Sequence, residues 1–147
     1  MHVKCSEELG GLMTTTTPDA GAIVRQMLDA FLAGDVEAFM SFIDDDIELN
    51  TAEHHPFLPH QYRGKQQFLE VVAKIAGELD GFRFDIQRVL GCGEAAISQL
   101  RYRGTVKNTG RSLDVQAAFV WDVHGGKVIR AQEYVDTWAF MDAWKAG

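Results

Sequence analysis

Two stretches near the C-terminus alternate between apolar and polar residues and are separated by a short glycine-rich turn. They run over residues 112–123 and 128–137, with Gly125 and Gly126 between them. Such alternation is typical of strands with one buried face, and paired glycines favour a tight hairpin turn. The sequence therefore predicts a β-hairpin. Its expected inward side chains are Leu113, Val115, Ala117, Phe119, Trp121, Val123, Ile129, Ala131, Glu133, Val135 and Thr137.

Glu133 is the one acidic residue in this apolar stripe. Strand geometry directs its carboxylate at the same interior as its neighbours, where an ionised acid is costly without a partner, a water or a chemical task. Burial among hydrocarbon raises the pKa of a carboxyl group, so that it holds or takes a proton near neutral pH. Glu133 is therefore the main candidate for a general acid or base. The alternative is a structural carboxylate bonded to a nearby Tyr, Trp or Arg.

The N-terminal half shows helical periodicity instead. Apolar residues recur at three- and four-residue steps between residues 23 and 32, which predicts a helix. Thr17 is its expected N-cap, Pro18 its first residue and Gly34 its end. Asp35 is expected to cap a second, shorter helix that the acidic run 44–46 ends, and a third helix is expected over residues 65–79.

Strands and loops account for the rest of the chain. Alternation predicts strands near residues 47–51, 82–87 and 99–103, and the prolines at 56 and 59 make residues 53–64 a structured loop. Helices come first and antiparallel hairpins later, which indicates an α+β domain with one curved antiparallel sheet and helices on a single face. Residues 1–16 have the composition of a disordered tail, and residues 17–147 of a single domain. The amphipathic segment with Trp138 and Trp144 either covers the open end of the sheet or forms a dimer contact.

Composition and cysteine usage set the class of protein. Of the 147 residues, 46% are apolar and 24% charged, which is ordinary for a globular domain. No apolar run reaches the roughly 18 residues of a membrane-spanning helix, and Glu7 and Glu8 stand where a signal peptide would be apolar. Cys5 and Cys92 lack the spacing of a zinc site or a disulfide framework, so we expect reduced thiols in a cytoplasmic protein.

The formal net charge of −7 argues against nucleic acid and anionic membranes as partners, because both are bound through clustered lysine and arginine. A local basic group does occur in and after the 99–103 strand, formed by Arg101, Arg103, Lys107 and Arg111. No interleaved aromatic residues or basic helical face accompany it, so we expect a solvated hairpin.

Three local sequences and their order resemble the nuclear transport factor 2-like superfamily. They are residues 24–46 (VRQMLDAFLAGDVEAFMSFIDDD), residues 62–65 (YRGK), and GKVI at 126–129 followed by EYVD at 133–136. Within that superfamily the chain is similar to the SnoaL-like polyketide cyclase and ketosteroid isomerase-like group. The resemblance implies a cone-shaped α+β fold, in which the N-terminal helices cover the concave face of the sheet around a deep apolar cavity. It also implies a homodimer.

The resemblance does not extend to steroid isomerase chemistry. The tyrosine and aspartate of that mechanism fall on Met27 and Thr51, which supply neither the donor nor the base, and a late-strand aspartic acid falls near Ala118. We therefore do not expect a ketosteroid isomerase. Limonene epoxide hydrolases of the superfamily use an Asp-Arg-Asp set, whose last-strand acid corresponds to Glu133. The strand that should carry the arginine and the second aspartate offers Arg101 and Arg103 but no acid, so the resemblance supports epoxide hydrolysis only in part. In SnoaL-like cyclases an acidic residue acts as acid or base, and Glu133 or Asp136 is the matching position.

Other side chains are expected near this site. Tyr102, on an inward strand position, either donates a hydrogen bond to a ligand or is a satisfied core tyrosine. His54 and His60 lie in the proline-containing loop that should cover the cavity mouth, where a histidine serves as proton shuttle or substrate contact; a solvated loop is the alternative. The loop lacks the regular spacing of a metal motif, so no metal is expected. The predicted catalytic residues are Glu133, Asp136, His54 and Tyr102, and the predicted ligand-binding residues are Met27, Phe31, Thr51, His60 and Trp121.

Two functions are compatible with this pattern. The first is an enzyme without metal or organic cofactor that binds a small apolar molecule and uses Glu133 for proton transfer in an isomerisation, cyclisation or hydrolysis. The second is a non-catalytic ligand-binding or dimerisation module in which Glu133 is structural. The pattern names no substrate.

Overall fold

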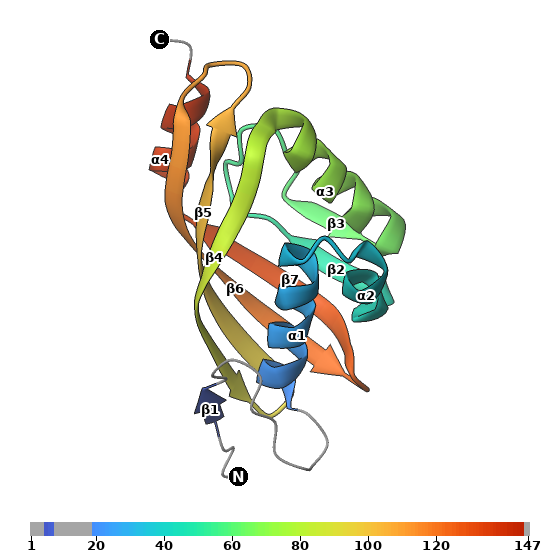
Figure 1. Cartoon of the computed structure of the whole chain (residues 1–147). Helices are drawn as coiled ribbons and strands as arrows, with labels where there is room; N and C mark the ends of the chain where they lie inside the picture. The colour runs from blue at the N-terminus through green and yellow to red at the C-terminus, as the bar shows by residue number, and fades with distance from the viewer. Residues whose placement is uncertain (1–4, 8–18, 146–147) are drawn as a thin grey trace.

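The computed structural model describes residues 5–7 and 19–145. The elements in chain order are β1 (Cys5–Glu7), α1 (Ala20–Leu32), α2 (Val36–Ser41), β2 (Ile43–Asn50), β3 (Gln61–Arg63), α3 (Lys65–Glu78), β4 (Leu79–Cys92), β5 (Ala95–Val106), β6 (Ser112–His124), β7 (Lys127–Val135) and α4 (Thr137–Trp144). The described strands form one seven-stranded sheet in the order β1-β4-β5-β6-β7-β2-β3. The sheet is curved and unclosed, and α1, α2 and α3 lie on its concave side (Figure 1). The predicted α+β class is confirmed.

The first helix begins later than expected. Asp19 is the N-cap of α1, and its side chain accepts a hydrogen bond from a first-turn N–H at 2.9 Å. A carboxylate in this position satisfies an otherwise unpaired donor and interacts favourably with the helix dipole. The cap expected at Thr17 is therefore wrong, and Thr17 and Pro18 lie outside the described residues. Asp35 caps α2 as expected.

The strands around β2 differ from the prediction in two respects. The acidic run 44–46 lies inside β2, although it was expected to end the second helix, and β3 forms within the segment expected to be a loop. β2 pairs antiparallel with β3 but parallel with β7. A wholly antiparallel sheet is thus wrong for the β2–β7 pair. Parallel strands need a long crossover, and the whole segment from β3 to β6 serves as that connection.

One extra residue in β7 decides which of its side chains face inward. Val123 pairs with Val128, and the residue before Val123 pairs with Arg130, so Ile129 forms a β-bulge. Ile129 is 39% exposed, whereas Val128 is fully buried. The prediction that Ile129 shares the inward face is therefore wrong. Alternation resumes after the bulge, and Glu133 faces inward as expected.

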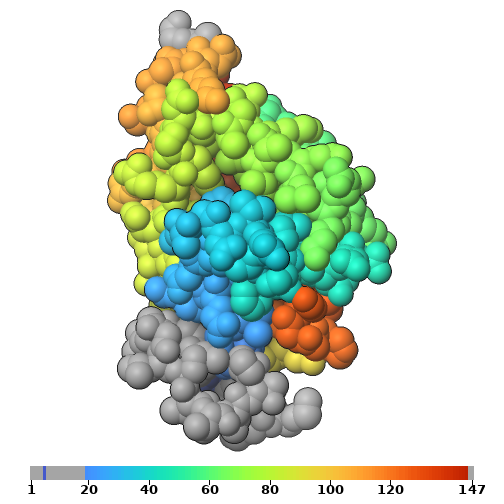
Figure 2. Space-filling view, turned by 45° about the vertical axis from the view of Figure 1, so that its right-hand side comes forward, coloured from blue at the N-terminus to red at the C-terminus, as the bar shows by residue number. Residues whose placement is uncertain are grey.

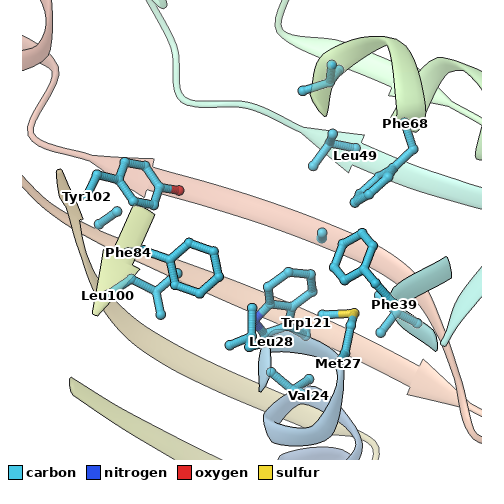
Figure 3. Close-up of a cluster of buried hydrophobic side chains, with 14 of the residues drawn as sticks. Val24, Met27, Leu28, Phe39, Leu49, Phe68, Phe84, Leu100, Tyr102 and Trp121 are labelled. Carbon is cyan, nitrogen blue, oxygen red and sulfur yellow. The ribbon is translucent and has the colours of Figure 1, made fainter. Parts of the chain in front are cut away.

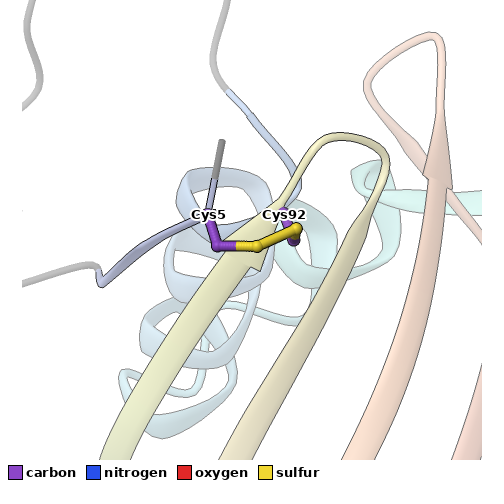
Figure 4. Close-up of a disulfide and its surroundings, with 2 residues drawn as sticks. All are labelled: Cys5 and Cys92. Carbon is purple, nitrogen blue, oxygen red and sulfur yellow. A yellow bond between two sulfur atoms is a disulfide. The ribbon is translucent and has the colours of Figure 1, made fainter. Parts of the chain in front are cut away.

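A disulfide joins Cys5 of β1 to Cys92 at the end of β4 (Figure 4). The two residues are also opposite each other in the antiparallel β1–β4 pair. The prediction of two reduced thiols is wrong, because the cysteines are 87 positions apart and no spacing signal announces their pairing. The expected cytoplasmic location loses the support that reduced thiols gave it. Residues 5–7 of the expected tail are thus a strand, and the rest of residues 1–16 lies outside the described residues.

The hydrophobic core lies between α1 and the concave face of the sheet. Figure 3 shows Met27 and Leu28 of α1 beside Trp121 of β6. α1 comes closest to β4 where Gly21 faces Gly91, because a Cβ added to Gly91 would lie 2.7 Å from the Gly21 nitrogen. Two residues without side chains therefore let the helix backbone touch the strand backbone.

The outer sheet face carries ion pairs between β5 and its neighbours. Arg101 and Arg103 pair with Asp114 at 2.7 and 3.1 Å, and Arg103 also pairs with Asp85 at 2.8 Å. The basic group seen in the sequence is therefore largely matched by acids. None of the helices in the described part of the chain is long and apolar enough to cross a bilayer.

α4 packs against the β5–β6 turn and the loop that follows β2. The ring of Phe140 lies 4.8 Å from that of His55 and 4.7 Å from that of Trp144, measured between centroids. Thr109 of the turn donates a hydrogen bond at 2.7 Å to a carbonyl of α4. α4 thus covers one end of the sheet, whereas Trp138 is 73% exposed. The expected homodimer stays a prediction.

Candidate functional site

An apolar cavity of about 450 Å³ lies between the concave face of the sheet and helices α1 and α3. Its lining residues are Leu28, Phe31, Phe39, Leu49, Thr51, Leu58, Phe68, Val71, Val72, Ile75, Ala76, Leu79, Gly81, Phe82, Phe84, Leu100, Tyr102, Phe119, Trp121 and Glu133. The volume falls in the range of small-molecule sites, which are mostly apolar with a few placed polar groups. The polar groups here are contributed by Thr51, Tyr102, Trp121 and Glu133.

The cavity reaches the surface between α1, α3 and the start of β4. Among its lining residues, Ala76 and Gly81 are exposed, whereas Phe84 and Leu100 are buried. Figure 2 shows a narrow hollow between the blue surface of α1 and the green surface of α3 and β4. The loop of residues 53–64, expected to cover the mouth, contributes Leu58 to the wall.

Glu133 is held in the cavity wall by two hydrogen bonds. The side chain is 8% exposed. The Tyr102 hydroxyl donates to Glu133 Oε2 at 2.8 Å, and the Ala52 N–H donates to Oε1 at 3.2 Å. Each carboxylate oxygen therefore has one internal donor and keeps further lone-pair capacity.

Burial raises the pKa of the Glu133 carboxyl group above its ordinary value, and the hydrogen bonds from Tyr102 and Ala52 oppose part of that rise. Burial and the neighbouring carboxylate raise the pKa of the Tyr102 hydroxyl well above its ordinary value. Tyr102 therefore keeps its proton and donates a hydrogen bond to Glu133. The pair has the chemistry of a general base with a fixed hydrogen-bond partner.

The Ala52 N–H is positioned by the ends of the loop that follows β2. The Thr51 hydroxyl donates to the Pro59 carbonyl at 2.7 Å, and the Thr51 N–H donates to the His60 carbonyl at 2.9 Å. His60 Nδ1 lies 2.7 Å from the Thr51 carbonyl oxygen, and it must be the donor because a carbonyl only accepts. These bonds close the loop immediately beside Glu133.

The structure brings several of the predicted residues together at the cavity. Phe31, Thr51 and Trp121 line it with Glu133 and Tyr102. Met27 does not reach it. Its side chain is fully buried in the core, because the helical turn that directs Leu28 and Phe31 to the cavity points Met27 at the sheet.

Asp136, His54 and His60 do not line the cavity. Asp136 is exposed and caps α4, accepting a hydrogen bond from a first-turn N–H at 3.1 Å. His54 is exposed at a left-handed backbone position with φ of 59°. His60 is exposed, and its side chain is hydrogen-bonded to the Thr51 carbonyl oxygen.

His55 is the histidine that this loop half-buries. Its Nδ1 accepts hydrogen bonds from the N–H groups of Phe57 and Leu58 at 3.4 and 3.2 Å. Burial lowers the pKa of His55 to about 4, so the ring is neutral at physiological pH. Its role is to hold the loop together and to pack against α4.

Sequence reasoning missed one partner of Glu133 and most of the cavity wall contributed by α3. The Ala52 donor is a backbone N–H, which no residue type announces. The wall of α3 did carry a signal, since Phe68, Val72 and Ile75 belong to the apolar face that predicted the helix. That signal predicts burial but does not separate a core face from a cavity face.

Solved structures with this arrangement of elements are NTF2-like proteins. An NTF2-like protein from Burkholderia thailandensis superposes with a TM-score of 0.81 at 28% identity, covering 88% of this chain and 99% of that one. A putative SnoaL-like polyketide cyclase from Jannaschia sp. has a TM-score of 0.76 at 16% identity, covering 92% and 99%. TerC, co-crystallised with polyporic acid, has a TM-score of 0.74 at 20% identity, covering 82% and 94%. The chain therefore has the NTF2-like fold.

The sequence narrows this class further. The model of the SnoaL-like domain family matches residues 24–131, and the chain belongs to that family. A comparison with curated proteins gave no match.

Proposed function

We propose that this protein binds a small, largely apolar molecule in the cavity and that Glu133 transfers a proton during its isomerisation, cyclisation or hydrolysis. The observation that supports the proposal is a buried carboxylate facing an apolar cavity of about 450 Å³. None of the described residues lining that cavity is Lys, Arg or His. A buried acid without a basic partner is uncommon unless it has a task, and groups with shifted pKa values gather at functional sites.

Glu133, Tyr102 and the apolar walls of the cavity each have a separate role in the proposed reaction. The Glu133 carboxylate takes a proton from a C–H or O–H group of the bound molecule, and its raised pKa makes it a stronger base than an exposed glutamate. Tyr102 fixes the orientation of the carboxylate through the hydrogen bond to Oε2. The apolar walls limit the water around the reacting groups. The proposal includes no metal or organic cofactor.

The comparisons support a small organic ligand but name no substrate. One solved structure of the same fold is described as a putative SnoaL-like polyketide cyclase, and TerC of the same fold was co-crystallised with polyporic acid. Steroid isomerisation is not proposed, because Met27, Thr51 and Ala118 occupy the positions that would carry it. Of these, Ala118 lies on β6 and does not line the cavity.

A non-catalytic module is the second candidate. Both oxygens of Glu133 already accept hydrogen bonds from Tyr102 and Ala52, which is also the arrangement of a structural carboxylate. In that case the protein binds the same class of molecule without converting it.

A panel of cyclic ketones, epoxides and aromatic polyketides tests the proposal on the wild type, Glu133→Gln and Glu70→Gln. Glu70 is exposed on α3, so its variant is the matched control for loss of one carboxylate. We expect at least one compound to raise the melting temperature and to be converted. Loss of a general base should slow conversion by about 10²–10⁴-fold in Glu133→Gln and leave Glu70→Gln unchanged. Binding with equal conversion by all three proteins would contradict a catalytic Glu133, and binding without any conversion would favour the module.

A further inference from the structure

The side-chain donors around the cavity are already used inside the protein. The Thr51 hydroxyl donates to the Pro59 carbonyl at 2.7 Å, and the Trp121 indole N–H donates to the Ser98 hydroxyl at 2.9 Å. Neither direction can be reversed, because a carbonyl has no hydrogen to give and an indole nitrogen accepts none. These two groups therefore offer a ligand no hydrogen.

The third donor is committed in the same way. The Tyr102 hydroxyl hydrogen points to Glu133 Oε2 at 2.8 Å, and a carboxylate only accepts. Glu133 Oε1 accepts from the Ala52 N–H, so both carboxylate oxygens are acceptors with lone pairs to spare. Among the described lining residues, the side-chain hydrogen bonding left for a ligand is acceptor capacity alone.

We propose that the cavity selects neutral ring compounds that present a hydroxyl group to Glu133, as a phenol or an enol does, and rejects skeletons of the same shape that carry only acceptors. This inference rests on the proposed function, because it concerns the ligand of the same cavity. The inference also narrows the range of expected ligands, since ethers, epoxides and simple ketones bring lone pairs to a site that already has them in excess.

The energetic reason is the cost of an unpaired buried group. A hydroxyl group gives the carboxylate a charge-assisted hydrogen bond, which is among the stronger contacts available to a ligand. An acceptor-only ligand displaces water from Glu133 without replacing its hydrogen bond and sets one lone pair against another. A site built around a ligand hydroxyl rejects the analogue without it far more strongly than a hydrophobic pocket rejects an extra methyl group.

The walls around Glu133 suit a flat ring. Phe119 is directly opposite Glu133 in the β6–β7 register, and its ring stacks on that of Trp121 with centroids 4.7 Å apart. The Phe82 ring meets the Tyr102 ring edge-on at 5.5 Å. Aromatic rings thus line the cavity beside Glu133 and beside its partner Tyr102, and a ring that packs on them brings its hydroxyl group to Glu133.

The test compares 2-naphthol with 2-methoxynaphthalene by isothermal titration calorimetry at neutral pH. The two probes share one ring system, and the ether differs only in having the donor masked by a methyl group. That methyl group adds apolar area, which by itself favours the ether. We expect wild-type protein to bind 2-naphthol at least about tenfold more tightly, the size of a hydrogen bond to a charged group. Equal or tighter binding of the ether would overturn the inference.

Glu133→Gln provides the second measurement. A glutamine there can accept from Ala52 through its oxygen and donate through its amide to the Tyr102 oxygen, which frees the Tyr102 hydrogen for a ligand. The preference for 2-naphthol should then fall below about threefold or reverse. A preference that survives unchanged contradicts the assignment to Glu133. Even if this variant does not fold, the comparison of the two probes on the wild-type protein still tests the inference.

The outcomes separate the two proposals. If neither probe binds, the selection by hydroxyl group fails, and the proposed function then stands or fails by the panel of ketones, epoxides and polyketides. If both probes bind equally, the cavity stands and only the selection by hydroxyl group fails. If 2-naphthol is preferred but no hydroxylated compound is ever converted, the selection stands and the catalytic proposal fails.

Discussion

His60 is hydrogen-bonded to the same peptide group whose N–H reaches Glu133. Its Nδ1 donates to the Thr51 carbonyl at 2.7 Å, and the Ala52 nitrogen bonded to that carbonyl carbon donates to Glu133 Oε1 at 3.2 Å. Hydrogen bonds to the two ends of one peptide group polarise it in the same direction and strengthen each other. An exposed loop histidine that does not line the cavity therefore acts on the buried carboxylate through the backbone.

Replacing His60 should change the titration of Glu133. His60→Ala removes the bond to the Thr51 carbonyl and so weakens the hydrogen bond from the Ala52 N–H to Glu133. Because that hydrogen bond lowers the pKa of Glu133, its weakening should raise the pKa further. His60→Asn keeps a side-chain donor and should lie closer to the wild type. Carbon-13 NMR of the labelled carboxyl group measures the midpoint directly. The same midpoint in wild type and His60→Ala would show that the loop bond is only structural, worth about 1 kcal/mol of stability.

The stability of the wild type relative to Glu133→Gln should depend on pH in a defined direction. Because the pKa of Glu133 is raised in the folded protein, the folded state binds this proton more tightly than the unfolded chain does. Its contribution is fully present below the ordinary carboxyl pKa and is lost as the pH rises through the folded value. As the pH rises, the melting temperature of Glu133→Gln should therefore increase relative to that of the wild type. Glu70→Gln should follow the wild type, and a parallel course for Glu133→Gln would show that the carboxyl group is not buried as described.

His55 should make the protein sensitive to acid. Its pKa is lowered from 6.5 to about 4 by burial, so the unfolded chain binds this proton first. The stability that depends on neutral His55 is present above pH 6.5 and is lost as the pH falls towards 4, by no more than about 3 kcal/mol. His55→Asn keeps an acceptor for the loop N–H groups and cannot be protonated. Its unfolding free energy should be lower at neutral pH but flatter between these pH values, and an equal acid slope in both proteins would contradict the assignment.

Reducing the disulfide should destabilise the protein. The bond closes a loop between cysteines 87 positions apart, and cross-links of this kind contribute about 2–4 kcal/mol, mainly by restricting the unfolded chain. We expect reductant to lower the denaturant midpoint of the wild type to that of Cys5→Ser. The variant should be insensitive to reductant, and a wild type equally indifferent to it would mean that the bond is absent in solution.

The contact between Gly21 and Gly91 should tolerate no side chain. A methyl group on Gly91 would meet backbone atoms of Gly21 at 2.7 and 2.9 Å, which neither element can easily relieve. Gly91→Ala should cost about 1–3 kcal/mol in the free energy of unfolding, as overpacked cores do. Gly77→Ala is the control, because nothing lies within 4 Å of the added atom and alanine favours the helix by about 0.5–1 kcal/mol. Similar effects in both variants would contradict the close approach.

Periodicity was sufficient to predict the main architecture. The three-to-four-residue spacing of α1 and the alternation of β6 identify faces that the structure buries. The first spacing gathers its residues on one face of a helix, and the second gathers them on one face of a strand. The inward direction of Glu133 followed from the same alternation. Tyr102 was expected either to donate to a ligand or to be a satisfied core tyrosine. Glu133 was not named as its partner, since the sequence gives the face of Tyr102 but not its neighbour across the sheet.

Features that join distant segments were not predictable in this way. The Cys5–Cys92 bond, the parallel β2–β7 pair and the donor at Ala52 each depend on where the folded chain places two remote backbones. The bulge at Ile129 was not predictable for a different reason. Isoleucine is ordinary in either a strand or a bulge, so its identity does not reveal the extra position.

That bulge bears on how much the length of this chain can vary. β7 absorbs a surplus residue at its hairpin end while its cavity end keeps strict inside–outside parity through Glu133. An insertion or deletion beside the hairpin can therefore be taken up locally and leave the acid in place. A single residue added between Ala131 and Glu133 has no such outlet, and it would rotate the carboxylate to the outer surface while the strand itself stayed paired.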